Sequence, residues 1–512
     1  MRISPPRRVA ICAGLTLLAS AAPVAAQARQ AGRAAGGRDP GPSLAALDQY
    51  VTQAVKDWRI PGLAIAVVAN DSLVFARGYG VLDLAKAERV NEHTRFAIGS
   101  TTKAMTSAAL GMLVDEGKLR WDDHVIDYLP DFRLYDPWVT RELTVRDLLT
   151  HRTGLPSTDL LWARADLSSD EMMRRLRFVR PSSSFRSQME YQNNTYAMGG
   201  AIVAKVSGMP WEDFVRTRIF APLGMTETEP LVSGITGKPN VATPHDDIRD
   251  TVRQVPVRTT DPVAPAGSVW SSVSDMSKWM RFILDSGRVG TKRLLTPATF
   301  TELVTPQIRA PLGLYPALSL SKPHAFSYGL GWFVQDYRGQ SVWMHTGSID
   351  GMSAIIGLLP DAKVGVYVLA NLDHAELRHA LMYRVFDMYA GNPPRDWSAE
   401  LRQLFASARA AARNAAPKRP ENPTAPTFPL DRYAGTYTDS TYGSVDVKLE
   451  NGALRVRFGR EDLGMLTPWD FDAFRAHGPP PEEAEVPVTF VPSGSGAVAS
   501  VRVFGVTFTR AR

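Results

Sequence analysis

The sequence contains almost no cysteine. Cys12 is the only one among 512 residues, and it lies in an N-terminal apolar segment that we expect to be removed. A chain without a second cysteine can form no internal disulfide, and the mature protein would have no thiol for chemistry. A domain of several hundred residues can obtain its stability from a hydrophobic core instead. The sequence therefore excludes a disulfide-stabilised scaffold and cysteine-based catalysis.

Long apolar runs and a strong charge excess are also missing. After the N-terminal segment, no stretch approaches the roughly eighteen consecutive apolar residues of a transmembrane helix. We therefore expect no stable membrane insertion after signal cleavage. The formal net charge is only +6, and Arg2, Arg7 and Arg8 supply three of these charges. No basic run with interleaved aromatic residues occurs, which argues against nucleic acid as a partner.

Residues 1–28 have the organisation of a secretory signal peptide. Three arginines precede the apolar stretch Val9 to Ala19, and small residues follow around Val24-Ala25-Ala26. This order predicts Sec-type export from a bacterium, and hence a periplasmic or secreted protein. A signal anchor that remains uncleaved is the alternative. Residues 29–42, rich in Gly, Ala and Arg, are expected to form a flexible lead-in.

The rest of the chain divides into two parts with different patterning. Residues 43–395 have strand-like segments near both ends and helical spacing between them, which predicts an α+β fold with one sheet closed by sequence-distant segments. Residues 396–427 form a predicted helix followed by a linker in which residues 417–429 contain five prolines. In residues 428–512, apolar and polar residues alternate in short runs separated by turns. This tail is predicted to be a small all-β domain.

The strongest local signal for chemistry is Gly99-Ser100-Thr101-Thr102-Lys103, at the start of a helix expected over residues 101–116. The i, i+3 spacing places the Ser100 hydroxyl and the Lys103 amine on one helix face. A serine hydroxyl is a weak nucleophile at neutral pH, and a lysine can take its proton only where burial or other cations lower the pKa of the amine. The Ser100 amide, at the helix N-terminus, can also bind an oxyanion. Taken alone, the motif fits better an N-cap serine beside a surface lysine.

Two further motifs change this balance. Tyr191-Gln192-Asn193 precedes a predicted helix, and it offers a phenol as second proton carrier and an amide that can hold a substrate carbonyl. His345-Thr346-Gly347 lies on a strand predicted over Ser341 to Gly347. Gly347 would let a substrate backbone lie alongside the strand, and the amide of Ser348 could be the second oxyanion donor. Three such motifs in one chain favour a catalytic site over packing.

The set resembles the serine β-lactamase and penicillin-binding-protein superfamily, in which S-x-x-K, a Tyr or Ser motif and K-T-G form one catalytic group. The Y-x-N form of the second motif is most similar to the branch with class C β-lactamases, D-aminopeptidases and esterases. Family-like stretches are also found at residues 143–157, 264–280, 328–332 and 358–373. The resemblance implies a β-lactamase-like fold over residues 43–395, with an antiparallel sheet flanked by helices and a helical subdomain. It also implies a lipocalin-like, small antiparallel β-barrel over residues 428–512.

The resemblance also implies a role for each motif residue. Ser100 would be the nucleophile that forms an acyl-enzyme, Lys103 its first proton acceptor and Tyr191 a general acid or base. His345 occupies the catalytic strand position where penicillin-hydrolysing relatives carry lysine. Because a histidine is mostly neutral at pH 7, this exchange favours esters or D-amino-acid peptides over β-lactams. Substrate contacts would come from Asn193, Thr346, Gly347 and Ser348, with the amides of Ser100 and Ser348 as the oxyanion hole.

We therefore expect an exported serine hydrolase that cleaves a carboxyl ester or a D-amino-acid amide, with a small molecule or peptide as substrate. β-Lactamase or D-Ala-D-Ala carboxypeptidase activity is the first alternative, and a catalytically quiet scaffold or penicillin-binding sensor is the second. The sequence has no G-x-S-x-G elbow and no H-E-x-x-H motif, and no metal or organic cofactor is implied. Strand edges in the tail would allow a homodimer.

Overall fold

The computed structural model describes residues 43–165, 167–478, 485–494 and 496–511. The predicted signal peptide and lead-in, residues 1–42, lie outside the described residues. Within the described part, no helix combines the length and the hydropathy that a membrane span requires.

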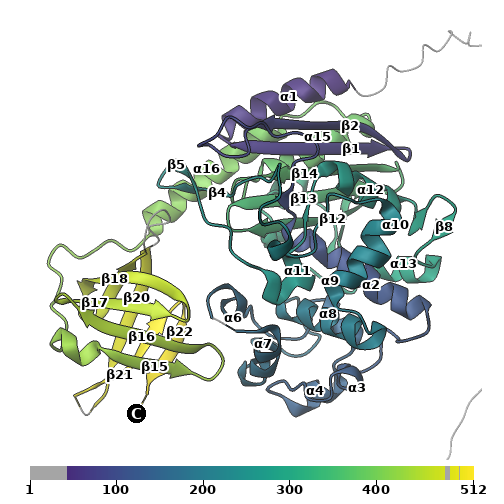
Figure 1. The fold of residues 1–512 in the computed structure, drawn as a ribbon. Helices are drawn as coiled ribbons and strands as arrows, with labels where there is room; N and C mark the ends of the chain where they lie inside the picture. Colours follow the sequence, from purple (N-terminus) through teal and green to yellow (C-terminus); the bar gives the residue numbers. More distant parts are fainter. Residues whose placement is uncertain (1–42, 166, 479–484, 495, 512) are drawn as a thin grey trace, which may run out of the picture. The chain divides into compact units, whose positions relative to one another are not determined.

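One antiparallel sheet of eight strands organises the first part of the chain (Figure 1). Its strand order is β2-β1-β14-β13-β12-β11-β10-β9, so that strands from the two ends of this part lie side by side at β1 and β14. The sheet is thus closed by sequence-distant segments, as the strand-like runs at both ends predict. The strands are β1 (Gly62–Ala69), β2 (Ser72–Gly80), β9 (Ile308–Arg309), β10 (Phe326–Tyr328), β11 (Phe333–Tyr337), β12 (Gln340–Ile349), β13 (Met352–Leu359) and β14 (Val364–Ala370).

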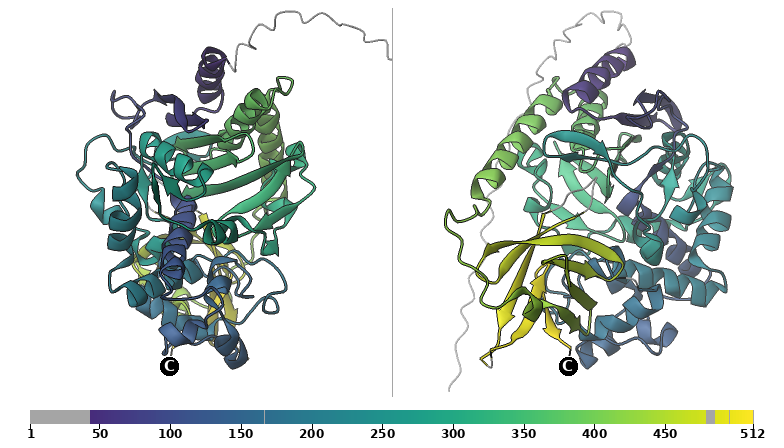
Figure 2. Two further views of the ribbon diagram at one scale, coloured as in Figure 1. Left: turned by 90° about the vertical axis from the view of Figure 1, so that its right-hand side faces the viewer. Right: turned by 60° about the vertical axis from the view of Figure 1, so that its left-hand side comes forward.

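Helices cover both faces of this sheet (Figure 2). Every residue of β1 is buried, with Ala64, Ala66 and Val68 in the core on one face and Leu63, Ile65 and Val67 in the core on the other. A continuous apolar strand of this kind is expected where a sheet is covered on both sides. The first face carries α2 (Thr102–Asp115), α8 (Asn194–Ser207) and α12 (Val273–Leu284), and the second carries α1 (Leu44–Asp57), α15 (Leu377–Tyr389) and α16 (Trp397–Ala415).

Short helices and hairpins complete this part of the molecule. Many of them lie between β2 and β9, where they form the helical subdomain next to α2 and α8. The helices are α3 (Val125–Tyr128), α4 (Pro137–Glu142), α5 (Val145–Leu149), α6 (Leu160–Ala163), α7 (Ser169–Arg175), α9 (Trp211–Val215), α10 (Ala221–Leu223), α11 (Ala264–Gly267), α13 (Pro297–Val304) and α14 (Leu318–Ser321). The two-residue to four-residue strands are β3 (Phe96–Ala97), β4 (His245–Ile248), β5 (Thr251–Gln254), β6 (Trp270–Ser271), β7 (Arg288–Val289) and β8 (Lys292–Arg293).

The C-terminal part is a closed antiparallel barrel of eight strands. The first and last strands pair through Tyr437 and Arg510, which closes the barrel and leaves it without a free edge among its described strands. The interior is filled with apolar and aromatic side chains, including Tyr433, Phe474 and Phe490. The strands are β15 (Gly435–Asp439), β16 (Gly443–Glu450), β17 (Ala453–Phe458), β18 (Glu461–Asp470), β19 (Ala473–His477), β20 (Glu485–Pro492), β21 (Val498–Val503) and β22 (Val506–Arg510).

Candidate active site

Ser100 lies in a single 3-10 turn, Gly99–Thr101, that leads directly into the buried helix α2. Gly99 has a φ of +52°, and a Cβ atom there would lie 2.8 Å from the amide nitrogen of Ser348 on β12. Only glycine combines this backbone conformation with such a close approach. The turn therefore packs against β12, and the two amides predicted to form an oxyanion hole, those of Ser100 and Ser348, lie on adjoining segments.

Gly347 is explained by the same packing. A Cβ atom at Gly347 would lie 1.9 Å from the carbonyl oxygen of Ile98, so any other residue would push the nucleophile turn away from the strand. The glycine is thus required by the protein's own backbone, whereas the sequence suggested a need for space beside a substrate. β12 pairs with β13 as far as Ile349 but with β11 only as far as Met344. Beyond Met344, β11 leaves one edge of β12 unpaired, and Thr346 and Ser348 line the cavity.

Lys103 is fully buried on the first turn of α2. Its Nζ atom lies 2.9 Å from Ser100 Oγ, 2.7 Å from Asn193 Oδ1 and 2.9 Å from the carbonyl oxygen of Ala266. Burial lowers the pKa of Lys103 from 10.5 to about 7, although the charge of Asp159 acts to raise it. The first two motifs predicted from the sequence are therefore joined by hydrogen bonds at a single amine.

The partners of Lys103 fix the direction of these hydrogen bonds. The amide oxygen of Asn193 and the carbonyl oxygen of Ala266 can only accept hydrogen bonds. A neutral amine has two hydrogens and one lone pair, so its two hydrogens go to these oxygens and its lone pair faces the Ser100 hydroxyl. This arrangement makes neutral Lys103 a base directed at Ser100.

Tyr191 is the second proton carrier at the site. Its side chain lines the cavity together with Ser100, and its ring centre lies 4.9 Å from Lys103 Nζ. Burial raises the pKa of Tyr191 well above its usual value of 10, so the hydroxyl keeps its proton at neutral pH. The ring packs 4.2 Å from the ring of His151, whose pKa is lowered well below 6.5 by burial. Tyr191 is therefore suited to donate a proton.

His345 is buried, and its ring is held in one orientation. Nδ1 lies 2.6 Å from the carbonyl oxygen of Thr346, which can only accept, so Nδ1 carries the hydrogen. Nε2 then accepts from the hydroxyl of Tyr328 at 3.0 Å. Burial, together with the charge of Lys103, lowers the pKa of His345 to about 3. The imidazole is thus neutral at pH 7, and it is not among the residues that line the cavity.

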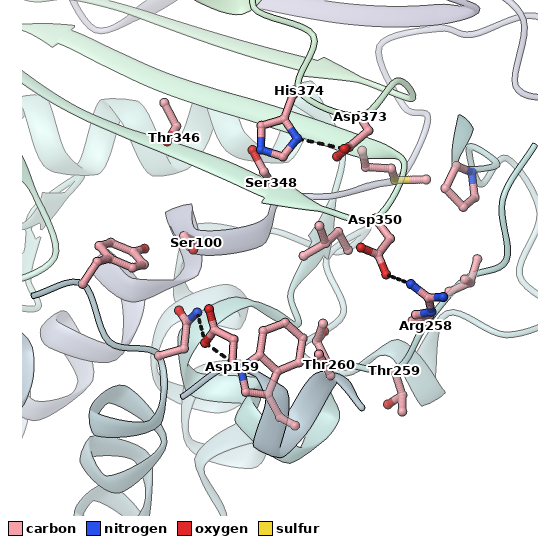
Figure 3. Close-up of a pocket in the computed structure, with 18 of the residues that line it drawn as sticks. Ser100, Asp159, Arg258, Thr259, Thr260, Thr346, Ser348, Asp350, Asp373 and His374 are labelled. Carbon is pink, nitrogen blue, oxygen red and sulfur yellow. Dashed lines mark hydrogen bonds and ion pairs between the residues drawn. The ribbon is translucent and has the colours of Figure 1, made fainter. Parts of the chain in front are cut away.

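A cavity of about 350 Å³ opens in front of Ser100 (Figure 3). It is lined by the predicted residues Ser100, Tyr191, Asn193, Thr346 and Ser348. The structure thus brings these five to one cavity, with Lys103 and His345 buried behind it. The charged side chains on the wall, and the indole beside one of them, were not singled out from the sequence: Asp159, Trp162, Arg258, Asp350, Asp373 and His374.

Further residues support the site without a motif of their own. Arg378 is buried and donates to the carbonyl oxygen of Gly347 at 2.6 Å and to Ser348 Oγ at 2.8 Å, which holds the end of β12. Burial acts to raise the pKa of its partner Glu376, but Arg378 and His379 lower it to about 2. Among the described residues, no group of three His, Cys, Asp or Glu side chains could hold a metal ion.

Comparison with known proteins gives matches to both parts of the chain. Residues 47–387 match the family described as Beta-lactamase, and residues 419–511 match a domain of unknown function, DUF3471. The unguisins hydrolase ungD of Aspergillus violaceofuscus is 31% identical over 433 residues, which cover 79% of this chain and 76% of that protein. Protein flp of Staphylococcus aureus is 25% identical over 354 residues, 64% of this chain and 63% of that protein.

Solved structures extend the similarity to the fold. The octameric penicillin-binding protein homologue from Pyrococcus abyssi matches with a TM-score of 0.61 and 21% identity, over 91% of this chain and 99% of that one. SurE matches with a TM-score of 0.54, also at 21% identity and with the same coverage. At this identity the two structures support the fold alone, a β-lactamase-like domain followed by a barrel.

Proposed function

The chain belongs to the beta-lactamase family, and from this premise we propose that it is an exported hydrolase that cleaves a carboxyl ester or a D-amino-acid amide through an acyl-enzyme on Ser100. The family and its hydrolase-named relative make the protein a serine hydrolase in general terms. The observation that carries the finer proposal is the 2.9 Å contact between Lys103 Nζ and Ser100 Oγ, because the two remaining Nζ partners can only accept hydrogen bonds and neutral Lys103 must therefore accept from the Ser100 hydroxyl.

In the acylation step, neutral Lys103 takes the proton of Ser100 as Oγ attacks the substrate carbonyl carbon. The amides of Ser100 and Ser348 would bind the oxyanion that forms. The bond from the carbonyl carbon to the leaving oxygen or nitrogen then breaks, and the leaving group receives the proton of the Tyr191 hydroxyl. Tyr191 regains a proton from the Lys103 ammonium, which returns both groups to their starting state.

Deacylation uses Lys103 and Tyr191 again: Lys103 accepts a proton from the nucleophile, and the proton then passes to the leaving group. A water molecule that replaces the leaving group gives its proton to Lys103 and attacks the acyl carbon. The ester bond to Ser100 Oγ breaks, and Oγ takes a proton back from Lys103, directly or through Tyr191. The acid product leaves, and no other proton carrier is required.

The neutral His345 supports esters and D-amino-acid amides over β-lactams. A lysine at this position would supply a permanent cation for the carboxylate of a penicillin. Here the imidazole is buried, its Nδ1 hydrogen is donated to Thr346 and its Nε2 is paired with Tyr328. It therefore offers neither a charge nor a free donor to a substrate carboxylate.

Intact-mass spectrometry tests this proposal. Purified protein is exposed briefly to a p-nitrophenyl ester, a D-alanine p-nitroanilide and a penicillin, and turnover is followed in parallel. We expect turnover of the ester or the anilide and a slow, persistent penicillin adduct. Ser100→Ala should lower the turnover by a factor of at least about 10⁴ and should form no adduct. Ser348→Ala is the matched control, because it removes the other serine hydroxyl of the cavity while keeping its amide, and it should still form the adduct. A protein that forms no adduct and turns over none of the three compounds contradicts the proposal.

A further inference from the structure

We propose that Asp159 and Trp162 form a binding site for an ammonium group next to Ser100, and that the preferred substrate carries a free amino group on its acyl part. This inference rests on the proposed function, since it names the class of acyl group that the Ser100 nucleophile receives. The substrate class would be aminoacyl esters or amides with an unblocked amine.

The first observation concerns the pairing of charges in the cavity. Two of its three carboxylates have a basic partner: Asp350 lies 2.7 Å from Arg258, and Asp373 lies 2.8 Å from His374 Nδ1. The pKa of His374 is raised by the hydrogen bond with Asp373, which favours the charged form of that pair. Asp159 forms no ion pair with any side chain in the described part of the chain. It is thus the carboxylate of this cavity that lacks a counter-charge.

The hydrogen bonds of Asp159 leave it ready for a ligand. One oxygen, Oδ1, accepts from Asn193 Nδ2 at 2.9 Å and from Trp162 Nε1 at 2.9 Å (Figure 3). Both donors are neutral, and they hold the carboxylate in one orientation. The other oxygen, Oδ2, accepts no hydrogen bond from the described residues, and Asp159 lines the cavity. A cation entering the cavity would find a fixed and unpaired acceptor.

Trp162 adds an aromatic surface at the same place. It lines the cavity beside Asp159, to which its indole N–H is bound. A carboxylate next to an indole is a favourable setting for an ammonium group, because the ring attracts cations and the carboxylate supplies a charge-assisted hydrogen bond. Arg258 and His374, the cations on the cavity wall, are each bound to a carboxylate, so the cavity is more favourable for binding an ammonium group than for binding an anion.

Asp159 is coupled to the catalytic Lys103 through the hydrogen bonds of Asn193 and through its charge. Asn193 links the two, since its amide nitrogen donates to Asp159 and its oxygen accepts from Lys103 at 2.7 Å. The Asp159 charge acts against the burial that makes Lys103 a base. An ammonium group bound at Asp159 would neutralise this charge, so a substrate with a free amine would favour its own acylation.

Paired substrates test the proposal. The values of kcat/KM are measured for D-alanine p-nitroanilide and for its N-acetyl derivative, which differ in the amino group. We expect the wild type to prefer the free amine by about tenfold or more, as for a charge-assisted hydrogen bond in a partly dry site. Asp159→Asn keeps an oxygen acceptor for Asn193 and Trp162 but removes the charge. It should therefore lower kcat/KM for the anilide with the free amine much more than for the N-acetyl anilide.

Asp373→Asn is the matched control variant. It removes another carboxylate from the same cavity, but His374 then loses the partner that raises its pKa, so the net charge of the cavity changes little. The ratio of the two kcat/KM values should therefore stay at the wild-type value.

The outcomes separate this proposal from the proposed function. If neither anilide nor any ester acylates Ser100, the proposed function fails. If both anilides react at equal rates in the wild type, or if Asp159→Asn lowers both by the same factor, the hydrolase stands and the ammonium site is refuted. In the second case Asp159 would act only as a positioning residue for Asn193.

Discussion

The interior of the barrel and the interior around Lys103 are both closed to water, but they contain different side chains. In the barrel, Phe474, Phe490 and Phe508 pack with aliphatic residues. The buried hydroxyl of Tyr433 donates to Asp472, and that of Tyr437 donates to the carbonyl oxygen of Tyr433. Around Lys103 the buried groups are an amine, the imidazoles of His151 and His345 and the hydroxyls of Tyr196 and Tyr328. One interior stabilises a fold, and the other keeps an amine neutral.

This contrast shows how burial can serve chemistry. Removing an ionic group from water disfavours its charged form, and a structural core avoids such a group or pairs it, as the barrel pairs Asp472 with the Tyr433 hydroxyl. In the active site the same effect lowers the pKa of Lys103 to about 7, while three hydrogen bonds keep the amine in place. The domain with the site therefore contains a destabilising residue that the barrel does not need, and the two regions should respond differently to mutation and to pH.

The largest effect on stability is expected from Phe490→Ala in the barrel. Phe490 is 2% exposed, and its ring lies 5.0 Å from that of Tyr433 and 5.5 Å from that of Phe474. The cavity left by this truncation should lower the free energy of unfolding of the barrel by about 3–5 kcal/mol. Urea denaturation followed by circular dichroism measures the loss. At low urea, kcat/KM should stay at the wild-type value, and a fall of tenfold would show that the two interiors are not independent.

The next effect is a pH-dependent gain in stability from Lys103→Met. The unfolded chain binds a proton at this lysine below pH 10.5, but the folded protein does so only below about pH 7. Between these values, lowering the pH destabilises the wild type by about 1.4 kcal/mol per pH unit through this group. The gain in free energy of unfolding of the variant over the wild type should therefore be larger at pH 8 than at pH 10, by about 2–3 kcal/mol.

Tryptophan fluorescence during urea denaturation can measure this difference, because all of the 11 tryptophans except Trp469 precede the barrel. The barrel variant Phe490→Ala, followed by circular dichroism, is the control, since it removes no titratable group and its loss of stability should be the same at both pH values. A Lys103→Met difference that is equal at pH 8 and pH 10 would contradict the lowered pKa of the amine.

Much of the fold could be predicted from the sequence because its signals are local. The apolar run at residues 62–69 and the run at 364–370 each indicate a buried strand, and the alternation around Val445 and Val456 indicates the barrel. The alternation of apolar and polar residues predicts burial poorly at strand ends: Leu449 follows the same pattern, but it is 43% exposed. The closure of the barrel through β15 and β22 depends on pairing between distant strands, which no local pattern encodes.

The site was predictable only where a motif joins its residues. Ser100 and Lys103 are one helix turn apart, so their contact follows from helical geometry. Asp159 and Arg378 lie in segments with no such spacing, and they reach the site through tertiary packing. Gly347 illustrates the same limit: the sequence marks a place where space is needed, but only the fold shows that Ile98 fills it.

The last effect, about tenfold per pH unit, is expected in the rate of catalysis. If neutral Lys103 takes the proton of Ser100, kcat/KM should be constant above about pH 7 and fall tenfold for each unit below it, as the amine becomes protonated. With a pKa of about 3, His345 stays neutral over this range, and Tyr191, whose pKa lies well above 10, keeps its proton. The profile is measured with the N-acetyl anilide, whose own charge does not change.

His374 is the cavity residue that could imitate this result, because its hydrogen bond with Asp373 raises its pKa above 6.5. The variant His374→Asn separates the two groups: the limb near pH 7 should remain if Lys103 causes it and vanish if His374 does. A limb that stays in His374→Asn and moves downward in Asp159→Asn would assign it to the amine, since removing the Asp159 charge removes the effect that raises the pKa of Lys103. The catalytic pH profile would then report the burial of one lysine, a property that the barrel interior lacks by its composition.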